Sequence, residues 1–327
     1  MNCLFFDYTL TDLQKFCVEH EKNKFLAKQV YEWVYGKLVW DFKEMSNISK
    51  DNRLWLANNF NFQEIKILRQ TQKNTVVYLE IQIDNQYLYA ALNTQNNQAA
   101  LSLEIGTNCS AHCDKCASNL NMYSISSLIH VVLLIQKTFE LKINHLYLNT
   151  FNLNDINLKI WDKVVARFNE ADGLQIGKRK INWITNGWNF DYNEWLTYNN
   201  HIDLIFESYG LATELISDIF VGLQPNISKW RANLTSMGLN SRNLLHFSYF
   251  LLKSKNDGSQ QIQDFANLVS NFRYYLDFLV WNQPTNTKLM TKSMYELIGI
   301  FAQQAVIRVE WKIPSYFTCE DKKKLFN

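Results

Sequence analysis

From Leu101 onward, segments with the pattern of β-strands alternate with segments that have the apolar spacing of helices. Strands are predicted at residues 101–105, 145–150, 181–185, 202–208, 246–252, 276–281 and 306–311. Helices are predicted between them at residues 127–140, 158–170, 227–237, 262–272 and 293–303. This alternation predicts a parallel sheet with crossover helices. The region spans about 210 residues, short for a complete eightfold barrel, so we expect an open, partial (β/α) barrel.

Two smaller parts precede this α/β region. Apolar residues at three- and four-residue spacing between Lys24 and Trp40 predict an amphipathic helix, and Ser46 and Ser49 are candidate caps for the next one. Strand-like runs at 76–83 and 87–92 flank a polar turn and predict a β-hairpin. We therefore expect a helical domain at 1–60, a hairpin linker at 61–98, the partial barrel at 99–311 and a tail at 312–327.

The composition excludes several classes of protein. Of 327 residues, 47% are hydrophobic and 20% are charged, which favours a folded core over disorder. The 33 Lys and Arg residues nearly balance the 31 Asp and Glu residues, so a strongly basic nucleic-acid coat is excluded while local basic patches are not. The longest strongly apolar run, residues 128–135, is far shorter than the ~20 residues that span a bilayer. No secretory leader is visible, and we expect a cytoplasmic protein.

Three of the six cysteines lie within eight positions, in the segment EIGTNCSAHCDKCAS. Cys109, Cys113 and Cys116 have the spacing C-x3-C-x2-C and directly follow the first strand of the α/β region. A structural zinc site normally takes four ligands, often as two separated pairs, and no second pair exists in this chain. An iron–sulfur cube held by three thiolates leaves one iron open to an external ligand. We therefore favour an iron–sulfur cluster on these cysteines, and a zinc site or three free thiols are the alternative interpretations.

The spacing, its place after the first strand and the expected partial barrel together resemble the radical S-adenosylmethionine (SAM) superfamily. The resemblance implies a [4Fe–4S] cluster on the three cysteines, with SAM bound to the open iron and cleaved by electron transfer. In such proteins the cofactor carries the difficult chemistry, while the chain supplies position and excludes water. The resemblance also implies an electron donor such as a flavodoxin or ferredoxin.

Further segments resemble the RlmN/Cfr-type RNA adenine methyltransferases across nearly the whole chain. Near the N-terminus, KFLAKQVYEWVYGK followed by FKEMSNISKDNR resembles the family's helical RNA-binding domain, which implies that residues 1–60 are an RNA-binding-like domain. Later segments are FSYFLLKSKND beside the family's EYVLLKGVND, FLVWNQP beside its IPYNP, and IRVEWKIPSYFTC, which matches the approach to its methyl-carrying cysteine. The resemblance implies a monomer that acts on structured RNA, rRNA or tRNA, at carbon 2 of an adenine. It places the methyl carrier at Cys319, where the alternative is a tail thiol without a role.

Other parts of the family's machinery are replaced in this chain. Ser102 stands where the family has a resolving cysteine, and Tyr89 where it has a glutamate that accepts a proton. A serine hydroxyl is a poor nucleophile in thiol exchange, and a tyrosine is protonated near neutral pH. In the segment LNTFNLND, Phe151, Asn152 and Leu153 stand where the family has a Gly-Glu-Pro motif that binds the ammonium group of SAM. Asn152 can offer a side-chain oxygen to this ammonium group but carries no negative charge.

At two further positions that contact SAM in the family, this chain has the same type of residue. The resemblance assigns them to Ser208 in FESYGL and Asn282 in VWNQP, while Gly210 stands where the family has histidine. Ser208 at a strand end also suits a helix cap or a loop hydroxyl without a cofactor role.

Three hypotheses remain open on function. The chain is an RNA methyltransferase with substitute groups, a radical SAM enzyme with altered chemistry, or an RNA-binding paralogue without turnover. A zinc-stabilised interaction domain is the structural alternative. Two short basic runs, residues 178–180 and 322–324, are candidate phosphate contacts or solvated surface.

Overall fold

The structure is a computed structural model that describes residues 3–73, 75–95, 98–105, 123–149, 158–187, 203–208, 210–211, 226–239, 245–251, 256, 258–270, 274–280 and 306–312. The described residues form two compact units. The first draws on residues 1–101, 123–146 and 160–181, and the second on residues 102–122, 147–159 and 182–327.

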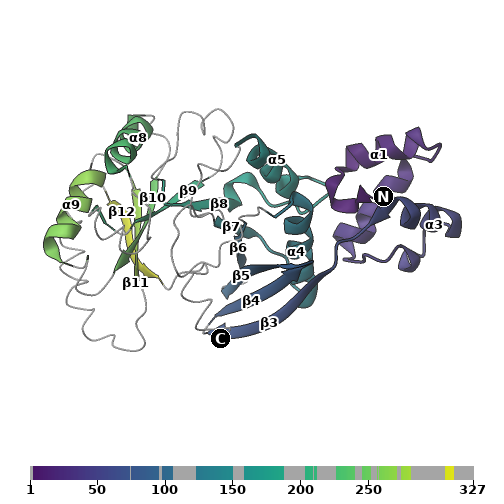
Figure 1. The fold of residues 1–327 in the computed structure, drawn as a ribbon, viewed down its shortest axis with the longest axis horizontal. Helices are drawn as coiled ribbons and strands as arrows, with labels where there is room; N and C mark the ends of the chain where they lie inside the picture. The colour runs from purple at the N-terminus through teal and green to yellow at the C-terminus, as the bar shows by residue number, and fades with distance from the viewer. Residues whose placement is uncertain are drawn as a thin grey trace. The chain divides into compact units, whose positions relative to one another are not determined.

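The N-terminal part of the first unit is helical (Figure 1). Its helical segments are η1 (Phe5–Asp7), α1 (Leu10–Glu19), α2 (Phe25–Tyr31), the π-helical η2 (Glu32–Gly36), η3 (Phe42–Glu44) and α3 (Lys50–Asn59). Two short parallel strands, β1 (Cys3–Leu4) and β2 (Phe60–Asn61), join the two ends of this part. The helix predicted between Lys24 and Trp40 is thus divided into α2 and the π-helical turn that follows it.

Side-chain caps fix where these helices begin. Thr9 and Asp12 form a capping box at the start of α1, in which the Thr9 hydroxyl accepts from the Asp12 amide at 3.1 Å. Ser49 caps α3 by accepting from the Asn52 amide at 3.3 Å, as predicted. Each cap satisfies a backbone donor that the first turn of a helix leaves without an intrahelical partner.

Aromatic rings fill the space between the N-terminal segments and helix α4 (Ile125–Thr138). The Phe5 ring packs against Phe62 at 5.2 Å, and the Phe6 ring lies 5.1 Å from the imidazole of His130 on α4. Ten of the fourteen α4 residues are buried, including polar ones, so this helix runs through the core of the first unit. Among the described helices, none combines the length and apolar character needed to cross a membrane.

Arg167, on helix α5 (Leu158–Asn169), ties residues 6–10 of the chain to this helix. Its side chain is 8% exposed, and the guanidinium donates to the backbone carbonyls of Phe6 at 2.9 Å and Tyr8 at 3.0 Å. It also forms an ion pair with Glu170, whose Oε1 accepts from the Leu10 amide at 3.0 Å. One buried cation therefore satisfies backbone acceptors that lie about 160 positions away in the sequence.

Hydrogen bonds join ten strands in the order β12-β11-β10-β9-β8-β7-β6-β5-β4-β3. Their bounds are β3 (Ile65–Lys73), β4 (Val76–Ile83), β5 (Gln86–Gln95), β6 (Gln98–Glu104), β7 (His145–Asn149), β8 (Ile181–Thr185), β9 (Asp203–Ser208), β10 (Leu245–Leu251), β11 (Tyr274–Val280) and β12 (Val306–Lys312). Within the first unit β3, β4 and β5 are antiparallel, and the predicted hairpin is β4 and β5. Sequence reasoning missed β3.

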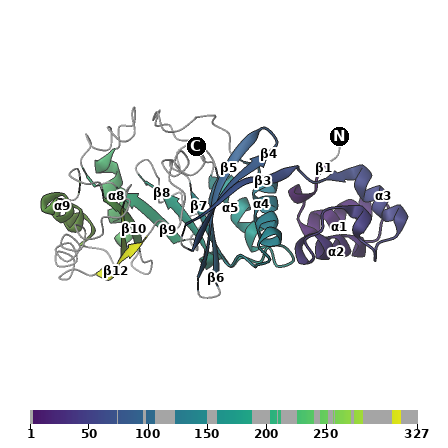
Figure 2. The same cartoon turned by 90° about the horizontal axis from the view of Figure 1, so that it is seen from below.

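Within the second unit, β8 to β12 pair in parallel. Helices α8 (Ile227–Leu239) and α9 (Ser259–Val269) pack against these strands (Figures 1 and 2). Phe265 on α9 meets the rings of Tyr249 at 5.0 Å and Phe247 at 5.7 Å, both on β10. The predicted α/β class is confirmed, and the sheet is mostly parallel. Among the described strands it does not close into a barrel, and the helix predicted at 293–303 lies outside the described residues.

Candidate active site at the carboxyl edge of the parallel strands

The second unit has several buried polar side chains, and Glu104, Asn149, Thr185 and Ser208 among them lie at the carboxyl ends of their strands. At most 9% of each of these residues is exposed: Ser102, Glu104, Asn149, Thr185, Asn186, Glu207, Ser208, Ser248 and Asn256. Polar groups are rarely buried in such number without hydrogen bonds or a ligand to satisfy them. The carboxyl edge is where open parallel sheets bind ligands, so this edge is the candidate site.

Strands β8 and β9 end in the same kind of turn. The Thr185 hydroxyl accepts from the amide of Gly187 at 3.0 Å, and the Ser208 hydroxyl accepts from the amide of Gly210 at 3.2 Å. Both glycines have positive φ angles, +71° and +99°. The two strands therefore present a buried hydroxyl followed by a sharply turned backbone at neighbouring places of the sheet.

Gly187 is required by its surroundings as well as by its backbone angle. A Cβ atom at this position would lie 2.7 Å from the Phe206 ring and 2.9 Å from Nε1 of Trp230 on α8. Sequence reasoning missed this turn. Its signal was the repeated pattern of a hydroxyl residue, any residue and glycine directly after a strand, in ITNG and ESYG.

Gly210 is buried and occupies the place where the resemblance led us to expect histidine. Its φ of +99° is a conformation that residues with a Cβ seldom adopt, and a Cβ there would lie 3.2 Å from the Tyr249 hydroxyl. That hydroxyl in turn donates to the backbone carbonyl of Asn256 at 3.0 Å. The backbone and its neighbours thus give a physical reason for the missing histidine.

Asn149 offers a buried acceptor at the end of β7. Its backbone carbonyl accepts from the Ile105 amide at 3.2 Å, next to the end of β6. Its side-chain Oδ1 is buried and has no hydrogen-bond partner among the described residues. Such an atom is costly to bury unless a donor reaches it. Thr185 and Ser208 lie at the ends of the next two strands in the sheet, so neighbouring strand ends carry buried oxygen acceptors, the groups that ammonium and hydroxyl donors of a ligand require.

The predicted site residues are described only in part. Ser208 lies at the carboxyl end of β9, 1% exposed, and Ser102 lies on β6, 2% exposed. The predicted ligands and contacts Cys109, Cys113, Cys116, Asn152, Asn282 and Cys319 lie outside the described residues. Within the described ranges, no group of three or more His, Cys, Asp or Glu side chains converges to hold a metal ion.

Tyr89, which stands in the place of the family's proton-accepting glutamate, lies on β5 beside a carboxylate. Its hydroxyl donates to Oε1 of Glu80 at 3.2 Å, and the two residues face each other across the β4–β5 pair. Glu80 also meets Nε of Arg69 at 3.4 Å, and its side chain is 12% exposed. The carboxylate absent at position 89 is thus present on the neighbouring strand.

Comparison with known proteins agrees with this fold. A solved structure titled as a radical SAM methyltransferase from Sphaerobacter thermophilus superposes with a TM-score of 0.76, at 15% identity and over 96% of each chain. Residues 4–61 match the family described as the ribosomal RNA large subunit methyltransferase N-terminal domain.

Relatives of similar length also match. A protein of Streptococcus mutans named probable dual-specificity RNA methyltransferase RlmN is 26% identical over 90% of this chain and 86% of its own. Its namesake in Streptococcus agalactiae is 25% identical over 90% of this chain and 84% of its own.

The chain therefore has the fold of a solved radical SAM methyltransferase, an α/β fold with a mostly parallel sheet. The predicted resemblance to the RlmN/Cfr-type family is confirmed: residues 4–61 match its N-terminal domain, and relatives named RlmN match over 90% of this chain.

Proposed function

We propose that this protein is a radical SAM RNA methyltransferase that acts on an adenine of structured RNA, rRNA or tRNA. The observation that carries the proposal is the buried polar edge of Asn149, Thr185 and Ser208, in a chain whose relatives are named RNA methyltransferases. Cys109, Cys113 and Cys116, in the segment that follows β6 in the sequence, would hold a [4Fe–4S] cluster. With SAM bound, this cluster supplies hydrogen-abstracting radical chemistry.

The chain's own residues orient the SAM molecule in this proposal. The turn at Ser208 and Gly210 presents backbone and hydroxyl groups, while Asn282 follows β11 closely in sequence. Asn152 replaces a carboxylate, so the SAM ammonium group loses a charge-assisted hydrogen bond of roughly 1.5–3 kcal/mol, or about one to two decades in affinity. Asn149 is a buried amide acceptor only three positions before it.

Cys319 would carry the methyl group that reaches the base. Ser102 then decides how the reaction ends, because a hydroxyl does not resolve a sulfur-linked adduct as a thiol does. We further propose a cytoplasmic monomer that receives electrons from a flavodoxin or ferredoxin.

A second function is an RNA-binding paralogue that keeps the cluster and lacks turnover. It is favoured by one specific observation, the coincident replacement of the resolving cysteine by Ser102 and of the Gly-Glu-Pro segment at 151–153. A third candidate function is a radical SAM enzyme with the same fold that catalyses a different reaction.

Anaerobic purification followed by iron, zinc and acid-labile sulfide analysis tests the metal centre. We expect one oxygen-sensitive iron–sulfur cube per chain in the wild type, and its loss in Cys113→Ala, with Cys17→Ala as the control for a buried thiol elsewhere. Stoichiometric zinc without sulfide would instead support the interaction domain. Methyl transfer to RNA with SAM and a reductant then separates the enzyme from the paralogue.

A further inference from the structure

Two buried side chains that carry oxygen acceptors lie side by side at the ends of β6 and β7. Glu104 is the last residue of β6, Asn149 is the last residue of β7, and the two strands are neighbours in the sheet. The amide of Asn144 donates to the carbonyl of Ala99 at 3.0 Å, and the amide of Ile105 donates to that of Asn149 at 3.2 Å. Residue numbers rise together along these bonds, so the strands run parallel. In a parallel pair, the amide that follows a residue bonds to the carbonyl of the residue beside it, so Glu104 is in register with Asn149.

This register brings the two side chains to one face of the sheet. Neighbouring strands are about 4.8 Å apart, which lets both side chains reach a single ligand group. Glu104 is 6% exposed and Asn149 is 2% exposed. Oδ1 of Asn149 has no hydrogen-bond partner among the described residues, and burying such an oxygen is costly unless a donor reaches it. The carboxylate beside it adds negative charge, so the pair fits a cationic group that donates several hydrogen bonds.

An ammonium group suits this pair better than a metal ion does. Ammonium carries one positive charge and donates three hydrogen bonds, whereas Ca²⁺ and Mg²⁺ take about six or more oxygen ligands. In the part of the chain that the structure describes, Glu104 belongs to no group of three His, Cys, Asp or Glu side chains that could share a metal. Glu104 precedes Cys109 by five positions, and Asn149 precedes Asn152 by three. The pair thus adjoins the segments to which the resemblance assigns the cluster and the SAM ammonium group.

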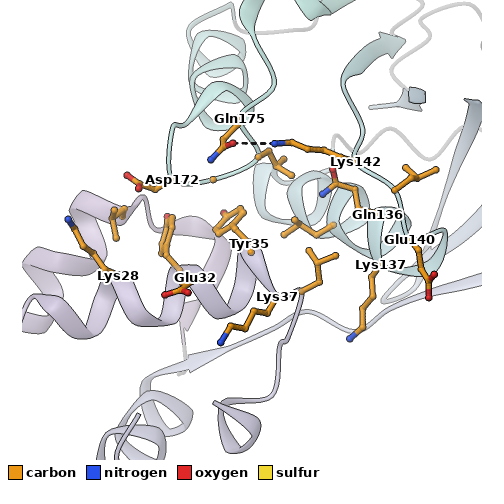
Figure 3. A pocket seen from close by; sticks show the side chains of 18 residues that line it. Lys28, Glu32, Tyr35, Lys37, Gln136, Lys137, Glu140, Lys142, Asp172 and Gln175 are labelled. Atoms are coloured by element: carbon orange, nitrogen blue, oxygen red, sulfur yellow. Dashed lines mark hydrogen bonds between the residues drawn. The ribbon is translucent and has the colours of Figure 1, made fainter. Parts of the chain in front are cut away.

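A pocket in the first unit is less suited to a cation. It has a volume of about 770 Å³ and is lined by four lysines and three carboxylates, all exposed (Figure 3). One of these lysines, Lys142, donates to Oε1 of Gln175 at 3.2 Å, the dashed line in Figure 3. The lysines repel a cation, and water competes for the exposed carboxylates. Neither effect acts on the buried Glu104 and Asn149 in the same way.

We propose that Glu104 and Asn149 hold the ammonium group of SAM and so replace the carboxylate that Asn152 does not provide. The inference rests on the proposed function and deepens it, because it names two positioning residues outside the segment 151–153. Glu104 accepts a charge-assisted hydrogen bond, and Oδ1 of Asn149 accepts a second bond. The contact at Glu104 offsets the one that is lost at position 152.

Calorimetric binding of SAM to the full-length protein, with its cluster reconstituted anaerobically, tests the pair without requiring turnover. Glu104→Gln should lower the affinity for SAM by about 10- to 100-fold, the effect of losing a hydrogen bond to a charged group. Asn149→Ala should lower it by about three- to tenfold, as for a neutral acceptor. Glu104→Asp keeps the charge on a shorter side chain and should lose less than Glu104→Gln.

The SAM analogue in which hydrogen replaces the amino group separates contact with the ammonium group from a general loss of structure. It lacks the donor, so the wild type, Glu104→Gln and Asn149→Ala should bind it with equal affinity. Gln136→Met is the control for removing a buried polar side chain, because Gln136 is 8% exposed on α4 and accepts from the Ile143 amide at 2.9 Å. Its affinity for SAM should equal that of the wild type.

Three outcomes would contradict the inference. If the wild type binds SAM and both variants bind it equally well, other groups hold the ammonium group, and the proposed function stands. Equal losses for SAM and for the analogue would show that the two residues support the site as a whole and do not contact the ammonium group. If the wild type with an intact cluster binds no SAM, both this inference and the radical SAM proposal are wrong.

Discussion

The hydroxyl of Tyr89 on β5 lies 3.2 Å from Oε1 of Glu80, its cross-strand neighbour on β4. Tyr89 alone is a poor proton acceptor, because a phenol is protonated near neutral pH. A hydrogen-bonded carboxylate changes this, since the phenol can pass its own proton to Glu80 as it takes one from a substrate. In the proposed function, Glu80 would therefore take the proton that the residue at position 89 cannot take by itself.

Glu80→Gln is expected to slow product release in a Ser102→Cys background by about a hundredfold, the lower range for loss of a general base. Arg69→Gln is the matched control. It removes the other partner of Glu80 and leaves the Tyr89 hydrogen bond in place, so product release should change little. Quantifying methylated RNA by mass spectrometry checks both variants. Equal rates for Glu80→Gln and its parent would show that the proton goes elsewhere.

Arg167→Met should destabilise the protein by about 3–5 kcal/mol. The substitution leaves the Glu170 carboxylate, whose side chain is only 16% exposed, without its cation and deprives the carbonyls of Phe6 and Tyr8 of a donor. Arg69→Met is a control for ion pairs as such, because Arg69 is 59% exposed and its pair with Glu80 contributes about 0–1 kcal/mol.

Urea unfolding gives both free energies for the arginine variants. Hydrogen exchange at residues 5–10 should speed up in Arg167→Met before the rest of the first unit opens. Similar losses of unfolding free energy in Arg167→Met and Arg69→Met would contradict the idea that the burial of Arg167 makes its contacts more stabilising.

Gly187→Ala should destabilise the second unit by about 1–3 kcal/mol. The new Cβ meets Phe206 at 2.7 Å, and alanine is strained at a φ of +71°. Gly177→Ala is the control, since Gly177 is exposed with a φ of −58° and its Cβ would have no neighbour closer than 3.9 Å. Thermal and urea unfolding of the two variants measure the difference, and a neutral Gly187→Ala would mean that β8 ends in another conformation.

Much of the α/β region was predictable because its strands are apolar and its helices amphipathic. Predicted strands at 181–185 and 306–311 correspond to β8 and β12 to within a residue. Strand β3 was missed for a physical reason. It lies at the edge of the sheet, most of its residues are exposed, and its sequence IKILRQTQK has no alternating apolar pattern beyond Leu68.

The candidate site was predictable only where a motif is local. Short segments predict both the cysteine site, which lies outside the described residues, and Ser208, which the structure places at the buried end of β9. The pairing of Tyr89 with Glu80 depends on strand register, and the contact between Arg167 and Phe6 joins residues 161 positions apart. Neither leaves a local pattern in the sequence, because both arise from how distant segments pack.

His130 should make stability depend on pH. Its imidazole is 5% exposed among aromatic rings, and burial lowers its pKa to about 4. The unfolded chain, with a histidine pKa near ~6.5, binds more protons between these values, so stability is full above about pH 6.5 and falls as pH drops towards 4. The loss reaches about 3 kcal/mol at most.

His130→Phe keeps the ring and removes the titrating group. Its stability should therefore vary less with pH than that of the wild type between pH 4 and 6.5, as followed by urea unfolding. Parallel curves for the two proteins would show that His130 is not the responsible group.

The replacement of the resolving cysteine by Ser102 predicts where the proposed reaction stops. Once the methyl carbon on Cys319 joins the base, release needs a nucleophile at sulfur, and the buried Ser102 hydroxyl is almost wholly protonated at neutral pH. Given structured RNA, SAM and a reductant, the wild type should accumulate a covalent protein–RNA complex that survives denaturing electrophoresis. Cys319→Ala should form none, while Ser102→Cys should release methylated RNA, with Glu80 available as proton acceptor through Tyr89. Ser126→Cys, which changes another buried serine, should behave like the wild type.

Multiple turnovers by the wild type would mean that another group resolves the adduct. An intact cluster and RNA binding, with neither adduct nor methylated Cys319, would favour the paralogue without turnover.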